Sequence, residues 1–300
     1  MIIPQMSQLL ECHVFLWYKK VMQQTVLITG ASSGIGRETA VLFAEKGYRV
    51  FACVRKKSDK FRLENTHKNI KGVYLDVTNQ NGIDKAFWYV MKNTAKIDVL
   101  VCCAGIAVAG PVESLPIKRI KEQFEVNTFG TIAVIQKFLP LIISGKIIYI
   151  SSMAASGIFP FLSPYCASKR ATDIMINSLA NEFKNKDINI VSIKPGCIIT
   201  PFWNKSVDSN IPVFEQSSEK MKDKYAKEME FMSENARKNN YRGTLPVEVA
   251  KTVYKAATSE KPKLSYTVGA DAFATMLFAK LAPQAFINKA VRFFIKKRMK

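Results

Sequence analysis

The stretch that decides the fold reads Thr25-Val26-Leu27-Ile28-Thr29-Gly30-Ala31-Ser32-Ser33-Gly34-Ile35-Gly36. Its first five residues are apolar or β-branched, which predicts a buried parallel strand, and a helical pattern begins at Arg37. A strand that runs through a glycine turn into a helix N-terminus forms a cradle for a pyrophosphate, because backbone N–H groups and the helix dipole face the anion. The alternative is a plain strand–helix connection, since a glycine-rich turn is weak evidence by itself.

The rest of the chain repeats the order strand, helix, strand. Further strands are predicted at 49–54, 71–75, 98–102, 146–151, 189–194 and 264–268, and long helices at 81–95, 117–143 and 165–186. This alternation predicts a single α/β domain, a Rossmann-type doubly wound parallel sheet with helices on both faces. A ligand then binds beyond the carboxyl ends of the strands, where Gly30, Gly105, Ser152 and Pro195 fall.

A second pattern, Tyr165-Cys166-Ala167-Ser168-Lys169, places a tyrosine and a lysine one helical turn apart on the same helix face. An ammonium beside a phenol favours the phenolate, so Lys169 is expected to lower the pKa of Tyr165. Such a tyrosine can exchange a proton with an alcohol, and the hydroxyl of Ser152 can bind the same oxygen. This chemistry suits carbonyl and alcohol redox, whereas an ordinary helix surface is the alternative for the pattern alone.

These motifs together resemble the short-chain dehydrogenase/reductase family over residues 23–200, and more loosely beyond. The family's glycine motif is matched by Thr29, Gly30, Gly34 and Gly36, its adenine-side acid by Asp76, its catalytic asparagine by Asn127, its serine, tyrosine and lysine by Ser152, Tyr165 and Lys169, and its Pro-Gly turn by Pro195, Gly196 and Thr200. One position departs from the family: Cys103 replaces the second asparagine of its Asn-Asn-Ala-Gly motif, which puts a hydrogen bond between neighbouring strands in doubt.

The resemblance implies roles for individual residues. The catalytic set would be Asn127, Ser152, Tyr165 and Lys169, with Asn127 holding a water that links Lys169 to solvent. The cofactor-binding set would be Gly30, Ser32, Ser33, Gly34, Ile35, Gly36, Arg55, Asp76, Val77, Ala104, Gly105, Tyr165, Lys169, Pro195, Gly196, Ile198 and Thr200. An amide on a polar helix face is the alternative for Asn127.

The end of the second strand indicates which cofactor is used. An enzyme that prefers NAD carries an acid there, which binds the ribose 2′-OH and repels a phosphate. This chain has Val54 followed by Arg55-Lys56-Lys57, and Arg55 can hold a 2′-phosphate through bidentate hydrogen bonds. The sequence therefore favours NADP(H), with NAD(H) also possible, over the alternative of a solvated basic loop.

Residues 201–245 leave the alternating rhythm and resemble the family's helical substrate lid. Phe202 and Trp203, with Phe159 and Phe161, predict an apolar pocket for a steroid-, retinoid- or lipid-like alcohol or carbonyl compound, although aromatic residues of the core are an equal alternative. The expected activity is interconversion of a secondary alcohol and a ketone or aldehyde. A dinucleotide-binding regulator or scaffold without turnover is the alternative function.

The 300 residues with 48% hydrophobic content suffice for one large domain, taken as residues 22–270. Six cysteines without a CxxC pattern and two histidines predict no metal site and a reducing, cytoplasmic location. By resemblance, a homodimer or homotetramer is expected. Residues 1–21 are interpreted as an upstream extension that is either non-native or disordered. An arm that touches a membrane is the alternative.

The net charge of +20 concentrates toward the C-terminus, where residues 272–300 contain seven cations and no acid. Apolar residues are interleaved with these cations, so residues 271–300 are expected to form a basic amphipathic helix that breaks near Pro283. Such a tail could contact an anionic membrane from its surface. Packing on the domain or on a second copy is the alternative, and nucleic acid is not expected as a partner because no nucleic-acid module is present.

Overall fold

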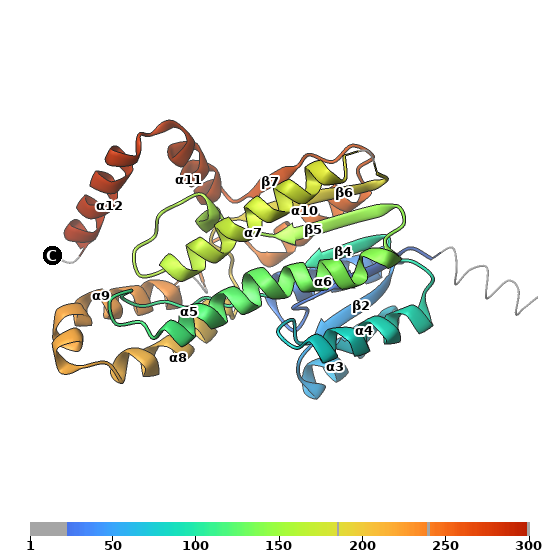
Figure 1. Ribbon diagram of the computed structural model, residues 1–300, viewed down its shortest axis with the longest axis horizontal. Helices are drawn as coiled ribbons and strands as arrows, with labels where there is room; N and C mark the ends of the chain where they lie inside the picture. Colours follow the sequence, from blue (N-terminus) through green and yellow to red (C-terminus); the bar gives the residue numbers. More distant parts are fainter. Residues whose placement is uncertain (1–22, 185, 239–240, 299–300) are drawn as a thin grey trace, which may run out of the picture.

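The computed structural model describes residues 23–184, 186–238 and 241–298. At its centre lies a parallel sheet of seven strands in the order β3-β2-β1-β4-β5-β6-β7 (Figure 1). The strands are β1 (Thr25–Ile28), β2 (Arg49–Val54), β3 (Ile70–Tyr74), β4 (Val99–Cys102), β5 (Gly145–Ile150), β6 (Ile188–Pro195) and β7 (Ser265–Val268). The predicted doubly wound sheet is confirmed, and the order reverses between β1 and β4, where such folds bind their ligands.

Helices cover both faces of the sheet, so its central strands are apolar throughout; all four residues of β1 are buried. One face packs on α2 (Gly34–Glu45) and α10 (Pro246–Thr258), and the other packs on α4 (Gln80–Asn93), α6 (Gly130–Phe138) and α7 (Ser163–Glu182). The short helix α3 (Lys57–Glu64) follows β2 and adds Leu63 to the first core. Cys53 and Cys102 are buried in the second core as small apolar side chains.

The predicted continuous helix 117–143 is wrong in one respect. The segment consists of α5 (Ile117–Phe124), a π-helical turn (Glu125–Phe129), α6, and a 3₁₀ turn (Leu139–Leu141). In the π turn, the carbonyl of Asn127 accepts hydrogen bonds from Thr131 Oγ1 at 2.9 Å and from Thr172 Oγ1 of α7 at 3.2 Å. The bond from Thr172 of α7 is a tertiary contact that no local sequence pattern indicates.

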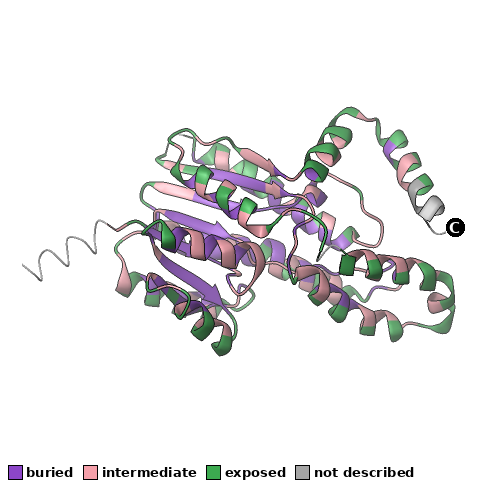
Figure 2. Cartoon of the chain, turned by 180° about the vertical axis from the view of Figure 1, so that it is seen from behind, coloured by how far each residue is buried: buried purple, intermediate pink, exposed green. Residues whose placement is uncertain are grey.

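Two helical pairs project from the sheet domain (Figure 1). The first pair is α8 (Phe202–Glu215) and α9 (Glu219–Lys238), which lie beyond the carboxyl ends of the strands where the substrate lid was predicted. The second pair is α11 (Ala270–Leu281) and α12 (Gln284–Arg298), which diverge from the body and meet near Pro283. This second pair, called here the C-terminal arm, is largely exposed on its surface (Figure 2). Within the described ranges, no helix has the length and apolarity needed to cross a bilayer.

Candidate active site

A cavity of about 390 Å³ lies at the carboxyl ends of the strands, between the sheet and α8. It brings together nearly all of the residues singled out from the sequence. The predicted cofactor residues that line it are Gly30, Ser32, Ser33, Gly34, Ile35, Arg55, Asp76, Val77, Ala104, Gly105, Tyr165, Lys169, Pro195, Gly196, Ile198 and Thr200, and Ser152 lines it too. Gly36 and Asn127 do not line the cavity and lie beneath its wall.

The glycine turn between β1 and α2 requires glycine at three positions. Gly30 and Gly34 have φ angles of +67° and +56°, which L side chains rarely adopt. A Cβ on Gly30 would lie 2.8 Å from the backbone of Ala104, and a Cβ on Gly36 would collide with the carbonyl oxygen of Gly30. Gly36 therefore allows α2 to pack closely on the turn and has no direct place in the cavity.

The N-terminus of α2 faces the cavity with the properties of an anion site. Its first turn contains no acid, and the N-cap residue Ser33 makes no side-chain capping bond. The methyl group of Thr200 packs against this turn, and a Cβ on Gly34 would lie 2.9 Å from Thr200 Cγ2. The backbone N–H groups of this turn and the helix dipole fit the pyrophosphate of a dinucleotide.

One end of the cavity, where the adenosine of a cofactor is expected, is formed by the ends of β2 and β3. Arg55 follows Val54 at the end of β2, and both residues line the cavity. The position where an NAD-preferring enzyme carries an acid is therefore occupied by an apolar residue followed by a cation. Asp76 Oδ1 accepts hydrogen bonds from Thr78 N at 3.0 Å and from Thr78 Oγ1 at 2.8 Å. These bonds hold the carboxylate at the cavity wall, the position expected for the adenine-side acid.

Ser152, Tyr165 and Lys169 meet at the other end of the cavity, and each is more than nine-tenths buried. Ser152 lies just after β5, and its Oγ accepts a hydrogen bond from Ala154 N at 3.1 Å. Tyr165 and Lys169 extend from the first turns of α7. Lys169 Nζ donates to the carbonyl of Ile150 at 2.8 Å and lies over the ring of Tyr149, 4.9 Å from its centroid.

The expectation that Lys169 lowers the pKa of Tyr165 is wrong for the cofactor-free protein. Burial raises the pKa of Tyr165 to about 12, and a hydrogen bond with Ser152 opposes this only in part. Burial also lowers the pKa of Lys169 to about 8, although Cys103, Asp173 and Cys102 favour its ammonium form. Sequence spacing predicted the common face of the helix but gave no measure of how completely both groups are desolvated.

Asn127 is 1% exposed and lies in the π turn, so the alternative of a polar helix face is wrong. Its Oδ1 accepts from Ile106 N at 2.9 Å, and its Nδ2 donates to the Ile106 carbonyl at 3.1 Å and to Ser168 Oγ at 3.2 Å. Asn127 thus fixes the loop after β4 against α7. The same loop begins with Cys103, whose backbone N–H, like that of Ala104, donates to Thr29 Oγ1.

The Pro-Gly turn after β6 is fixed by the C-terminal arm. The carboxylate of Asp271, in the first turn of α11, accepts a hydrogen bond from Cys197 N at 2.6 Å. Gly196 has no room for a side chain, because a Cβ there would meet this carboxylate. The turn then continues through Ile198 and Thr200 into α8, so the cavity wall and α8 share one connected segment.

The aromatic residues expected around the substrate divide into two groups. Phe202 and Trp203 line the cavity, and the Phe202 ring lies 6.1 Å from that of Tyr165. Phe159 packs behind Tyr165, whereas Phe161 has a φ of +65° and contacts Tyr225 of α9 at a ring distance of 6.1 Å. Half of the predicted aromatic set therefore forms the cavity wall, and the other half lies outside it.

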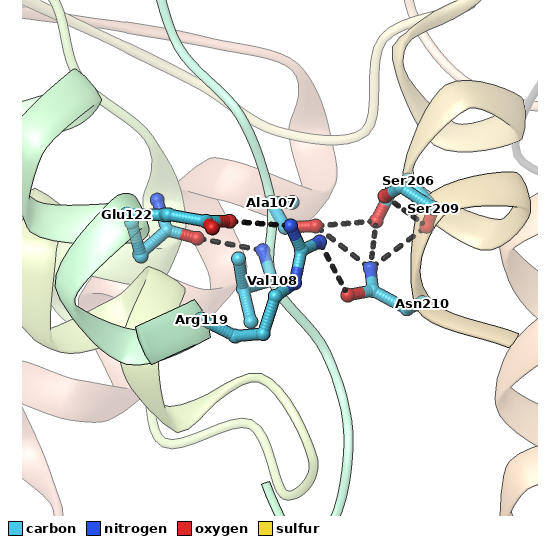
Figure 3. Close-up of polar contacts among 8 residues, drawn as sticks. Ala107, Val108, Arg119, Glu122, Ser206, Ser209 and Asn210 are labelled. Atoms are coloured by element: carbon cyan, nitrogen blue, oxygen red, sulfur yellow. Dashed lines mark hydrogen bonds and ion pairs between the residues drawn. The ribbon is translucent and has the colours of Figure 1, made fainter. Parts of the chain in front are cut away.

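Several residues of α8 at the cavity have no sequence motif and were missed. Lys205, Ser206 and Ser209 line it. Ser206 Oγ and Asn210 Nδ2 both donate to the carbonyl of Ala107, at 2.8 and 2.9 Å, and Arg119 approaches Asn210 from α5 (Figure 3). This buried network joins α8 to the loop after β4, and only the folded arrangement brings its members together.

A phosphate cradle and a buried serine–tyrosine–lysine group at opposite ends of one cavity define the class of protein, an oxidoreductase that uses a nicotinamide dinucleotide. A family model described as short chain dehydrogenase matches residues 24–210. The chain belongs to the short-chain dehydrogenase/reductase family of NAD(P)-dependent oxidoreductases.

Similar proteins cover nearly the whole chain. It is 33% identical over 292 residues to the NADPH-dependent 3-dehydrocapnine reductase of Ornithobacterium rhinotracheale, a match that covers 91% of this chain and 93% of that protein. It is 28% identical over 277 residues to the 3-ketodihydrosphingosine reductase of Bacteroides thetaiotaomicron, covering 90% and 97%. The structure of ElxO with NADP bound superposes with a TM-score of 0.66 at 25% identity, covering 82% of this chain and 96% of that one.

Proposed function

We propose that this protein is an NADPH-dependent reductase that converts a lipophilic ketone to a secondary alcohol, with Tyr165 as the proton donor. The observation that carries the proposal is the convergence of Ser152, Tyr165 and Lys169 on one cavity whose far end carries Arg55 and the glycine turn. Arg55 without a neighbouring acid at the end of β2 supports NADP(H) as the preferred cofactor, with NAD(H) possible. The NADPH-dependent relative and the NADP-bound structural neighbour agree with this preference.

The mechanism follows from the state of each group. Bound NADPH supplies the hydride for the carbonyl carbon. Because burial raises the pKa of Tyr165 to about 12, the phenol is protonated at neutral pH and can donate its proton to the oxygen as negative charge develops there. Ser152 hydrogen-bonds the same oxygen, and Lys169 supplies positive charge one turn further along α7. Asn127 bonds the loop after β4 to α7, the helix that carries Tyr165 and Lys169.

A lipophilic ketone as the substrate is supported by two independent features. Phe202, Trp203 and Ala107 give the cavity an apolar wall beside Tyr165. Two relatives are named for 3-dehydrocapnine and 3-ketodihydrosphingosine, names that specify a substrate oxidised at position 3. The apolar wall suits a lipophilic substrate, and the names of the relatives suit a ketone.

The proposal is tested by following NADPH absorbance over a panel of ketones with alkyl chains of increasing length. We expect kcat/KM to rise with chain length, and Tyr165→Phe to reduce kcat by about 10²–10⁴-fold while cofactor binding is retained. A Tyr165→Phe variant that keeps most of its kcat would refute the mechanism. A protein that binds NADPH but turns over no ketone or alcohol would instead support the alternative of a regulator or scaffold.

We also propose that the C-terminal arm contacts an anionic membrane surface. Phe273, Leu277 and Leu281 recur every four residues along α11 and are 50–72% exposed, and residues 272–300 contain no acid to oppose their cations. Co-sedimentation with anionic and neutral vesicles should show salt-sensitive binding to the anionic ones alone, lost when the chain ends at Asp271. A full chain that stays in the supernatant at low salt would refute this role. A dimer or larger oligomer that forms through the arm would also refute it.

A further inference from the structure

Lys205 is the point at which α8 reaches the glycine turn. Its Nζ lies 3.3 Å from Ser33 Oγ, although 172 residues separate the two in sequence. Both residues line the cavity, and Ser33 is the N-cap of α2. The Lys205 side chain therefore places a positive charge directly beside the helix N-terminus that forms the phosphate cradle.

We propose that Lys205 binds the pyrophosphate of the cofactor from the side of α8, opposite the N-terminus of α2. The proposal rests on the dinucleotide site described above and assigns a further residue to it. In the described part of the chain, no carboxylate forms an ion pair with Lys205, so its charge is not already neutralised by the protein. An ammonium on a flexible stem can exchange its contact with Ser33 Oγ for one with an anion bound at the N-terminus of α2.

The position of Lys205 is set by the residue that follows it. Ser206 and Asn210 bind the carbonyl of Ala107, and Arg119 reaches Asn210 Oδ1 at 3.4 Å (Figure 3). These buried bonds fix one face of α8 to the loop after β4. The neighbouring face, which carries Lys205, is thereby turned toward the cradle. A lysine on a docked helix loses less freedom on binding than one on a loose loop.

This arrangement gives Lys205 and Arg55 different roles that experiment can separate. Arg55 lies at the end of β2, where only the 2′-phosphate of NADP(H) is expected. Ser33, the neighbour of Lys205, lies at the α2 N-terminus, where the pyrophosphate common to both cofactors is expected. Loss of the Lys205 charge should therefore weaken NADPH and NADH alike, whereas loss of Arg55 should weaken NADPH alone.

The test compares Lys205→Gln with Lys227→Gln, which removes an exposed lysine of α9 outside the cavity. Binding of NADPH and of NADH is measured by titration calorimetry without substrate. We expect Lys205→Gln to raise both dissociation constants by about five- to tenfold, with a shallower salt dependence, and the control to leave them unchanged. Unchanged affinities, or a loss confined to NADPH, would overturn the pyrophosphate assignment. Failure of the wild-type protein to bind either cofactor would instead refute the proposed function.

A second measurement reports on α8 itself. In the wild-type protein, NADPH should slow amide hydrogen exchange across residues 202–215, because the bound pyrophosphate joins α8 to α2 through Lys205. Lys205→Gln should lose most of this cofactor-dependent protection while keeping the exchange pattern of the cofactor-free protein. Equal protection in the two proteins would show that α8 does not hold the cofactor through this lysine.

Discussion

Replacing Lys169 with methionine should change how the stability of the protein depends on pH. Lys169 is 6% exposed, and burial lowers its pKa from 10.5 to about 8. At neutral pH the folded protein therefore carries an ammonium group that is poorly solvated. Methionine has a similar length and no charge, so it removes this penalty while filling the same space.

The pKa values give both the sign and the size of the effect. Between pH 8 and 10.5 the unfolded chain holds a proton on Lys169 that the folded protein has released, so stability rises with pH across this window. With 1.36 kcal/mol for each pH unit, the penalty is about 3 kcal/mol at pH 7 and falls by about 2 kcal/mol at pH 9.5. At pH 7 alone the variant is less informative, because the lost hydrogen bond to the Ile150 carbonyl costs about 1.5–3 kcal/mol in the other direction.

Urea denaturation of the cofactor-free protein at pH 7, 8, 9 and 9.5 measures this difference. The free energy of unfolding of the wild type, minus that of Lys169→Met, should increase by about 2 kcal/mol over the series. Lys184→Met, at an exposed position just beyond α7, controls for the introduction of a methionine. A difference between wild type and Lys169→Met that stays constant with pH would refute the claim that Lys169 is desolvated.

Two further substitutions test the cofactor end of the site. Arg55→Ala should weaken NADPH binding by about tenfold or more and leave NADH nearly unchanged, because a charge-assisted phosphate contact contributes about 1.5–3 kcal/mol. Titration of both cofactors measures this, and equal losses for the two would rule out the 2′-phosphate contact. Gly36→Ala should lower the free energy of unfolding by about 1–3 kcal/mol, because its Cβ would collide with the Gly30 carbonyl. Gly82→Ala is the matched control, since its Cβ would meet nothing closer than 3.5 Å, and similar urea midpoints for the two variants would contradict this reading of the turn.

Patterns that are local in sequence predicted most of the fold and the site. The apolar runs predicted all seven strands, and the carboxyl ends of β1, β4, β5 and β6 line one cavity, where the ligand was expected. The failures concern features that depend on distant residues. The π turn contacts Thr172 of α7, which lies 45 residues away, and the approach of Lys205 to Ser33 depends on how α8 docks on Ala107. The raised pKa of Tyr165 likewise reflects burial by segments that no local pattern specifies.

The π turn at Glu125–Phe129 has a consequence for how this segment tolerates change in length. Each residue of an α-helix advances the chain by 100° around the axis, so one extra residue rotates everything after it by that angle. Here the rotation lets α5 direct Gln123 to the backbone of Ile106 and Val108, while α6 directs Val134 and Phe138 into the core. A deletion of one residue in the turn would straighten the helix and bring one of these two faces out of phase. In most loops such a deletion is absorbed at the surface. Here it would disrupt either the packing of α6 in the core or the hydrogen bonds from Gln123 to the loop after β4.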